Sequence, residues 1–212
     1  MFLYLSLVLI QAPLTPFDNR IAFRQIKQSH ERLTRFSTSS PKNGTIPRII
    51  TLGGDHTITL PALRAIHANF GKVAVLHFDS HLDTWSPEVL SGNQSSYAAI
   101  NHGTFLHIAH EEGLLVDGKN MHAGIRTQLE SWGDIKNDRR CGFGIVYAND
   151  IDRYGVQGVV ERIKKRVGEE KVYVSVDIDV LDPAYAPATY DSRDAELTEG
   201  EHPRLEDGLR ES

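Results

Sequence analysis

The sequence predicts an α/β fold with a mainly parallel sheet, and three observations carry that prediction. Short apolar runs over residues 49–52, 73–78 and 172–176 are typical of buried strands. Residues 60–69 have helical spacing and separate the first two runs, and strand–helix–strand order is typical of a parallel sheet. Acidic residues and histidines follow all three runs, where the carboxyl ends of parallel strands form sites.

Apolar periodicity and turn residues predict the remaining elements. We expect a helix over residues 19–36 with Asp18 as its N-cap, and a second helix over 104–112. A third helix over 156–167 ends in three basic residues, where cations suit the helix dipole. Shorter strands are expected at 122–125 and 144–147, and loops at 37–44, 87–96 and 131–140.

The length of 212 residues and the 40% apolar content suit one domain with a sizeable core. We expect that domain to cover residues 1–189, because neither a repeat nor a linker interrupts them. Residues 190–212 differ, since eight Asp or Glu stand there against three Arg, with few apolar residues. This acidic tail is expected to be disordered.

Charge and cysteine content exclude several classes of protein. The net charge of -5 argues against nucleic acid or an anionic membrane as the main partner. Cys141 is the only cysteine, so an intrachain disulfide and a zinc site built from several thiolates are both excluded. The apolar residues 1–10 are too short to span a bilayer and lack the basic start of a signal peptide. We therefore expect a cytoplasmic or mitochondrial protein rather than a secreted one.

Candidate metal ligands gather in three short clusters. Side chains two apart in a strand share a face, so alternating ligands at the end of a strand converge. Oxygen-rich sites with some imidazole suit Mn²⁺, with Zn²⁺, Fe²⁺ and Co²⁺ as alternatives, and carboxylates can bridge two such cations. The six candidates are His56, Asp79, His81, Asp83, Asp177 and Asp179.

Three strings carry a resemblance to a known family. Gly53-Gly54-Asp55-His56, Asp79-Ser80-His81-Leu82-Asp83 and Ser175-Val176-Asp177-Ile178-Asp179-Val180-Leu181-Asp182-Pro183 resemble the signatures of the arginase/agmatinase (ureohydrolase) family. The resemblance extends from about residue 16 to residue 189. It implies a three-layer α/β/α fold around a mainly parallel sheet, and a two-Mn²⁺ enzyme that hydrolyses a guanidinium group to urea and an amine.

The resemblance also implies roles for individual residues. The six candidate ligands occupy the family's metal positions and divide between two cations. His102 matches a histidine at the site mouth that touches substrate and moves protons, and Asp83 shares in that proton transfer. Asp55 matches a position that orients His56, while His122 is structural or lines the substrate. Trp85 stands where arginase-like members carry an Asn for the α-carboxylate of arginine, so agmatine, which lacks that carboxylate, fits better.

The chain departs from the family pattern at both ends. After Thr189 the sequence lacks the segment leading to the Glu that pairs with the guanidinium, and the family's first strand has no counterpart before Pro13. We therefore expect an incomplete version of the sheet, and association into a homo-oligomer stays open. Two alternatives stay open: an inactive metal-binding fragment or pseudoenzyme that acts through association, and a one-metal amidohydrolase of the deacetylase type.

Overall fold

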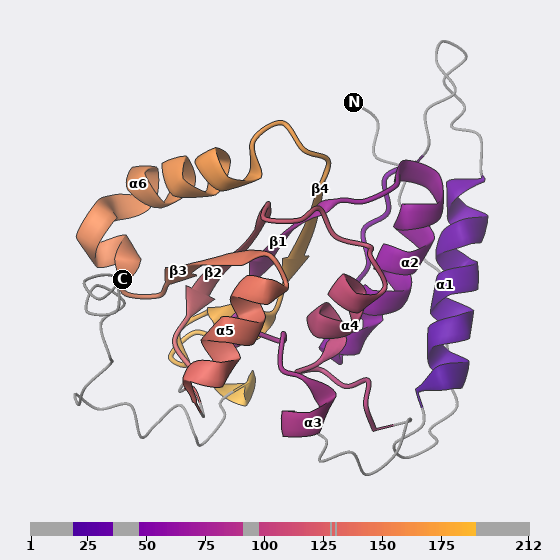
Figure 1. Ribbon diagram of the computed structural model, residues 1–212, viewed down its shortest axis with the longest axis horizontal. Helices are drawn as coiled ribbons and strands as arrows, with labels where there is room; N and C mark the ends of the chain where they lie inside the picture. Colours follow the sequence, from indigo (N-terminus) through magenta and orange to yellow (C-terminus); the bar gives the residue numbers. More distant parts are fainter. Residues whose placement is uncertain (1–18, 36–46, 91–97, 128, 130, 190–212) are drawn as a thin grey trace.

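Four parallel strands form the centre of the molecule. The computed structural model describes residues 19–35, 47–90, 98–127, 129 and 131–189 (Figure 1). The strands lie in the order β3-β2-β1-β4, and each neighbouring pair is parallel. Their bounds are β1 Ala74–Phe78, β2 Asn120–Ile125, β3 Phe143–Tyr147 and β4 Val172–Val176. The predicted α/β class with a parallel sheet is confirmed.

Helices connect these strands and cover both faces of the sheet. They are α1 Arg20–Thr34, α2 Thr59–Phe70, α3 Pro87–Leu90, α4 Phe105–Glu111, α5 Trp132–Arg140 and α6 Asp150–Val167, with single 3₁₀ turns η1 His56–Ile58, η2 Ile178–Val180 and η3 Pro187–Thr189. Gly155 has a φ of 66° and interrupts helix α6. The helix expected from residue 156 corresponds to the part of α6 that follows this interruption.

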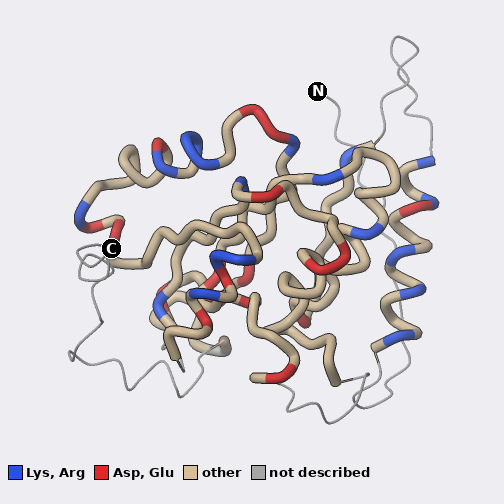
Figure 2. Tube along the Cα trace, in the orientation of Figure 1, with Lys and Arg blue, Asp and Glu red and all other residues tan. Residues whose placement is uncertain are grey.

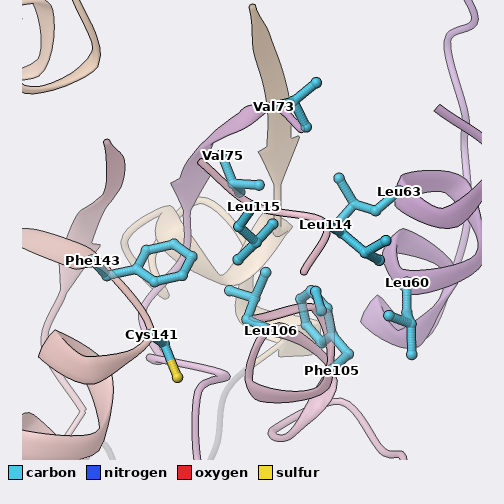
Figure 3. Close-up of a cluster of buried hydrophobic side chains, with 11 residues drawn as sticks. Leu60, Leu63, Val73, Val75, Phe105, Leu106, Leu114, Leu115, Cys141 and Phe143 are labelled. Atoms are coloured by element: carbon cyan, nitrogen blue, oxygen red, sulfur yellow. The ribbon is translucent and has the colours of Figure 1, made fainter. Parts of the chain in front are cut away.

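One face of the sheet packs against α2 and α4. Leu60 and Leu63 of α2, with Phe105 and Leu106 of α4, meet Val75 of β1 in the largest buried cluster (Figure 3). The other face carries Met121, Ala123 and Val146, which pack against α6. This arrangement confirms the three layers. Outside them, α1 packs on α2, and charged residues follow the length of α1 (Figure 2).

The sheet register brings the ends of β1 and β4 together. Phe78 pairs with Val176, and the backbone N–H of Asp177 donates to the carbonyl of Phe78 at 2.8 Å. On the other side of β1, the N–H of Asp79 donates to the carbonyl of Ala123 at the end of β2. The residues that follow these strands therefore share one edge of the sheet, as expected for a site in an α/β protein.

Two sequence-based assignments are wrong. Residues 49–52 form no strand, and Leu52 is 86% exposed, because the described residues offer that segment no strand to pair with. Residues 131–140 contain helix α5 rather than a loop, since Ser131 and Asp134 form a capping box that starts it. Smaller differences concern Asn19, which is the N-cap residue of α1, and Pro87–Leu90, which forms one helical turn.

The outer strand β4 has an uncovered face. Val172, Val174 and Val176 are between 41% and 64% exposed, whereas Val75 on the neighbouring strand is fully buried. Among the described residues, β4 thus pairs only with β1 and leaves one of its faces exposed. The expected acidic tail and the apolar residues 1–10 lie outside the described residues. Within the described part of the chain, none of the helices combines the length and apolar character needed to cross a bilayer.

Candidate metal centre

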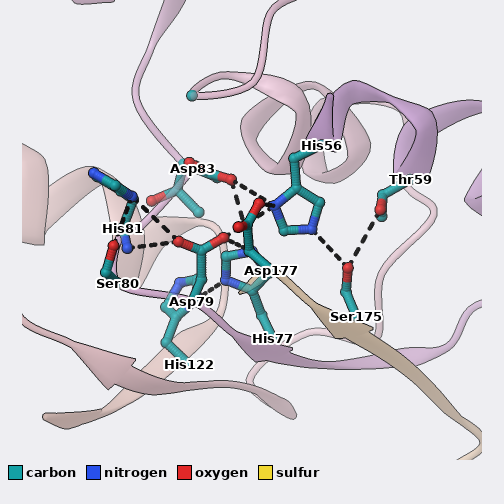
Figure 4. Close-up of polar contacts among 12 residues, drawn as sticks. His56, Thr59, His77, Asp79, Ser80, His81, Asp83, His122, Ser175 and Asp177 are labelled. Atoms are coloured by element: carbon teal, nitrogen blue, oxygen red, sulfur yellow. Dashed lines mark hydrogen bonds and ion pairs between the residues drawn. The ribbon is translucent and has the colours of Figure 1, made fainter. Parts of the chain in front are cut away.

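The six predicted ligands meet where β1 and β4 end and the turn η1 begins. Figure 4 labels five of them, which are His56, Asp79, His81, Asp83 and Asp177. Asp79, His81 and Asp83 follow β1, Asp177 and Asp179 follow β4, and His56 begins η1. Segments more than 90 residues apart in sequence therefore contribute to one cluster. Parallel strand order explains this, because the carboxyl ends of β1 and β4 are neighbours in the sheet.

His56 lies at the centre of the first group. Its Nδ1 is 2.9 Å from Asp79 Oδ2, and it is 3.2 Å from each of Asp83 Oδ2 and Asp177 Oδ2. The other ring nitrogen, Nε2, is held 2.7 Å from Ser175 Oγ on β4, which fixes the ring. Nδ1 is buried and has no partner in hydrogen-bond geometry, although three carboxylates surround it. A ring nitrogen and three carboxylates that converge on one point form an environment that a divalent cation stabilises.

The second group lies on the other side of Asp79. His81 Nδ1 is 3.3 Å from Asp79 Oδ1 and 2.9 Å from Asp179 Oδ2. Asp179 also accepts from the backbone N–H of Ser80 at 3.0 Å, which ties the turn after β4 to the turn after β1. Asp79 therefore belongs to both groups, one with His56 and Asp83 and one with His81 and Asp179. Such a shared carboxylate is what bridges two cations about 3.5–4 Å apart in hydrolytic sites.

Hydrogen bonds from Arg126 hold the turn that contains Asp179. Its guanidinium donates to the carbonyls of Asp179, Val180 and Leu181. The same turn packs closely against β2 at Gly124, where a Cβ would lie 2.4 Å from Val180 Cγ2. Gly124 also has a φ of +107°, which other residues rarely adopt. Glycine is therefore required at this position of β2.

Charge and burial shift the protonation of these groups. Burial alone would lower the pKa of His56, but Asp177, Asp79 and Asp83 outweigh it and raise that pKa to about 12. Burial also lowers the pKa of His81, but Asp179 and Asp79 outweigh it and raise that pKa to about 10. Burial and the charge of Asp79 raise the pKa of Asp83 above its ordinary value. In the metal-free protein, protons therefore balance the carboxylates that cations would otherwise balance.

The structure places one more histidine, His77, beside the predicted ligands, although the sequence motifs did not predict it. His77 Nε2 is 3.1 Å from Asp79 Oδ2 and 3.7 Å from Asp83 Oδ2. It is fully buried and belongs with His56, Asp79 and Asp83 to one group of possible ligands. A signal was present in the sequence, because residue 77 precedes Asp79 by two and so shares its face of the strand.

Two of the remaining predicted residues, Asp55 and His102, lie at the rim. Asp55 accepts from the backbone N–H of Thr57 at 2.9 Å and so caps η1, which begins with His56. Its other oxygen is 4.0 Å from His102 Nδ1, and both side chains are more than half exposed. His102 lies in a loop that is tied to the segment after Asp83, because the N–H of Trp85 donates to the carbonyl of Gly103 at 3.0 Å.

Trp85 and His122 pack among other side chains. The indole of Trp85 is partly buried against the cluster of Leu82, Ile125 and Ile135, and its Nε1 has no hydrogen-bond partner. His122 lies on β2 and is fully buried, 2.9 Å from Asp138 on α5. The structure thus gives His122 a position behind the cluster, which agrees with a structural role.

Comparison with known proteins identifies the family of this chain. Residues 8–194 match the arginase family. The chain belongs to the arginase family. It is 52% identical over 185 residues to putative agmatinase 1 of Schizosaccharomyces pombe, a match that covers 84% of this chain and 47% of the relative. It is 35% identical over 168 residues to an agmatinase of Escherichia coli, with 79% and 49% covered. The chain thus spans about half the length of the curated relatives it matches.

Solved structures of the arginase family share the fold. The proclavaminate amidino hydrolase of Streptomyces clavuligerus is 34% identical, with a TM-score of 0.65, and the match covers 82% of this chain and 52% of that one. A hypothetical agmatinase of Burkholderia thailandensis is 31% identical with a TM-score of 0.62, covering 78% and 45%. The predicted resemblance and the predicted fold are both confirmed, and the partial coverage agrees with an incomplete sheet.

Proposed function

We propose that this arginase-family chain is a two-Mn²⁺ hydrolase of a linear guanidino compound, with agmatine as substrate and putrescine and urea as products. The observation that carries the proposal is the position of Asp79, which contacts both His56 and His81 and belongs to two groups of ligand atoms. The names of the relatives, which are agmatinases or putative agmatinases, support the substrate.

The residues present fit two cations. His56, Asp79, Asp83 and Asp177 would hold the first, and the unpartnered buried Nδ1 of His56 is suited to a metal bond. Asp79 and Asp179, with His81, would hold the second. Four carboxylates and two imidazoles favour Mn²⁺, with Zn²⁺, Fe²⁺ or Co²⁺ as alternatives. When bound, such cations supply positive charge and a water of lowered pKa.

The chain's own residues would then bind the substrate and move protons. His102 is exposed at the rim and faces Asp55, a position from which an imidazole can deliver a proton to the leaving amine. Asp83, whose pKa is raised by burial and by Asp79, is a second group for proton transfer. Asp55, as the cap of the turn that starts at His56, would position that ligand.

The substrate preference follows from Trp85. An indole offers no amide group for the α-carboxylate of arginine, but it can pack against an alkyl chain or a cation. Agmatine has a guanidinium, an alkyl chain and an amine, and no carboxylate. The predicted preference is therefore for agmatine over arginine.

A second candidate function follows from the length of the chain. The match covers about half of each curated relative, and the sheet has an uncovered face on β4. An inactive metal-binding fragment or pseudoenzyme, acting through association, would have the same ligand cluster. Metal binding without turnover would identify it.

The deciding experiment is urea release from agmatine by the Mn²⁺-loaded protein, with arginine alongside. Asp79→Asn is the control, because it keeps the size of the side chain and removes the shared charge. Urea from agmatine that is absent with Asp79→Asn supports the enzyme. No urea from a folded sample that binds two Mn²⁺ per chain supports the inactive alternative, and one metal per chain would contradict the two-metal site.

A further inference from the structure

Asp83 has an unusual backbone conformation. Among the described residues, it alone is not a glycine and yet has a positive φ, which is 53°. Left-handed backbone is unfavourable for a residue with a Cβ, although aspartate adopts it more often than most residues do. The side chain is buried, and its Oδ2 lies 3.2 Å from His56 Nδ1 (Figure 4). Such a conformation persists only where the surrounding structure enforces it.

Hydrogen bonds from neighbouring elements hold the chain on the far side of Asp83. The carbonyl of Asp83 accepts from the N–H of Leu106 in the first turn of α4 at 3.1 Å. The N–H of Trp85 donates to the carbonyl of Gly103 at 3.0 Å. Thr84 lies between them and is almost completely buried. Because the φ of Asp83 sets the direction of its side chain, the carboxylate keeps its place only while these following residues keep theirs.

Helix α5 contacts Thr84 through two consecutive side chains. The amide of Asn137 donates to the carbonyl of Thr84, and the hydroxyl of Thr84 donates to Asp138 Oδ1 at 2.8 Å. The same oxygen of Asp138 lies 2.9 Å from His122 Nε2 on β2, and Asp138 is fully buried. Both the backbone and the side chain of Thr84 are therefore held by α5, and any shift of this residue would break a buried hydrogen bond.

Attachment of the helix does not require these polar groups. Ile135 of α5 already packs against Leu82 and Ile125 in an apolar cluster. Asp138, in contrast, has a second oxygen, Oδ2, that is buried with no hydrogen-bond partner among the described residues. Burial of such an atom costs free energy that an apolar residue at this position would avoid. This cost points to a role for the carboxylate other than attaching α5 to the sheet.

We propose that Asn137 and Asp138 are positioning residues for the metal centre. By holding Thr84, they fix the left-handed backbone of Asp83 and so aim its carboxylate at the first cation. The inference rests on the proposed function and extends the centre to a helix outside the three ligand strings. The second cation, beside His81, takes no ligand from residues 83–85, so α5 should affect the first cation more than the second.

The test removes one hydrogen bond to α5 and measures Mn²⁺ binding by calorimetry. Thr84→Val keeps the shape of the side chain and lacks the hydroxyl. It should weaken the first Mn²⁺ by about 10–100-fold, as loss of a partner behind a ligand typically does. The second Mn²⁺ should be less affected. Thr84→Ser keeps the hydroxyl and should bind both cations as the wild-type protein does.

Two further variants separate positioning from stability. Ser131→Ala weakens the start of α5 but leaves the contacts with Thr84 in place, so metal affinity should stay unchanged. Asn137→Ala removes the other hydrogen bond from α5 and should weaken the first cation in the same direction as Thr84→Val. The visible absorption of bound Co²⁺, which depends on the number and geometry of its ligands, should change in Thr84→Val and not in Ser131→Ala. Circular dichroism checks folding, and Asn137→Ala serves if Thr84→Val is unfolded.

The outcomes separate this inference from the proposed function. Folded Thr84→Val and Asn137→Ala variants that bind the first Mn²⁺ as tightly as the wild-type protein would overturn the positioning role and keep the enzyme. Equal weakening by Ser131→Ala would also overturn it, because α5 would then act through stability alone. A selective loss of the first cation in a protein that releases no urea would support the positioning role and overturn the activity. A wild-type protein that binds no divalent cation would overturn both.

Discussion

Strands β1 and β4 lie side by side and both lead into acids that are candidate metal ligands, yet their surroundings differ. The side chains of Val75 and His77 on β1 are fully buried, and Asp79 is almost completely so. On β4, Val174 and Val176 are more than half exposed, and the described residues place only one neighbouring strand beside it. The candidate ligands after β1 thus follow a buried strand, whereas those after β4 follow an outer strand with exposed side chains.

This difference indicates which contacts hold the ligands after β4 in place. The N–H of Asp177 donates to the carbonyl of Phe78, and the N–H of Ser80 donates to Asp179. Arg126 adds bonds to the carbonyls after β4. The outer strand therefore depends on hydrogen bonds to its neighbours more than on burial of its own side chains.

The largest effect should follow from removing the acid that both groups of ligands share. Asp79→Asn is expected to lose both cations, because Asp79 contacts His56 and His81 at once. Asp179→Asn should lose only the second, since it contacts His81 and not His56. Metal analysis after dialysis should give close to none per chain for the first variant and close to one for the second. Equal losses in both variants would contradict the division of the centre.

Metal binding should release protons and strengthen as pH rises. The raised pKa values of His56 and His81, to about 12 and about 10, mean that both rings carry protons at neutral pH without metal. Each cation must displace one of these protons, so the affinity of each site should rise by up to about tenfold per pH unit below those pKa values, and the affinity for both cations together by up to about 100-fold. Calorimetry in two buffers of different ionisation enthalpy counts the protons. A count near zero would contradict the convergence of carboxylates on these rings.

The same substitution on the two strands should have unequal effects on stability. Val75→Ala empties space in the packed cluster and should cost about 2 kcal/mol. Val174→Ala, at a position 55% exposed, should change the free energy of unfolding by less than about 0.5 kcal/mol. Urea denaturation of both variants measures the difference. A cost at Val174 as large as at Val75 would mean that β4 is covered in solution.

A smaller difference than that between Val75→Ala and Val174→Ala is expected between the starts of helices α5 and α6. Ser131→Ala removes a side chain that accepts from the N–H of Gly133 and should cost about 1 kcal/mol. Asn149→Ala, before α6, is the matched control because Asn149 makes no side-chain cap and should cost less. Denaturant midpoints of the two variants give the comparison.

The sequence predicted the strands of the sheet and failed where tertiary context decides. The apolar runs of β1 and β4 and the helix α2 were found from periodicity alone. The run at 49–52 has the same composition but no partner strand among the described residues, so it remains irregular. Helix α5 was missed because its charged sequence lacks an apolar stripe, although Ser131 and Asp134 have capping-box spacing.

The candidate site was predictable where ligands alternate along a strand. Asp79, His81 and Asp83 could be grouped from their spacing, and the structure places Asp79 and Asp83 beside His56 and Asp79 also beside His81. The contacts of His77 with His122 and Asp138 could not be predicted, because they depend on how β1, β2 and α5 pack. A histidine within an apolar run is an ordinary core residue by composition, and only the folded structure places His77 beside Asp79 and Asp83.

The single thiol of this chain makes it convenient for labelling. Cys141 is fully buried and burial raises its pKa to about 12, so the folded protein offers alkylating reagents almost no thiolate at pH 7.5. A cysteine introduced at an exposed position such as Val174 would then be modified alone. One spectroscopic probe could report on the outer strand as cations are added, without any change to the interior.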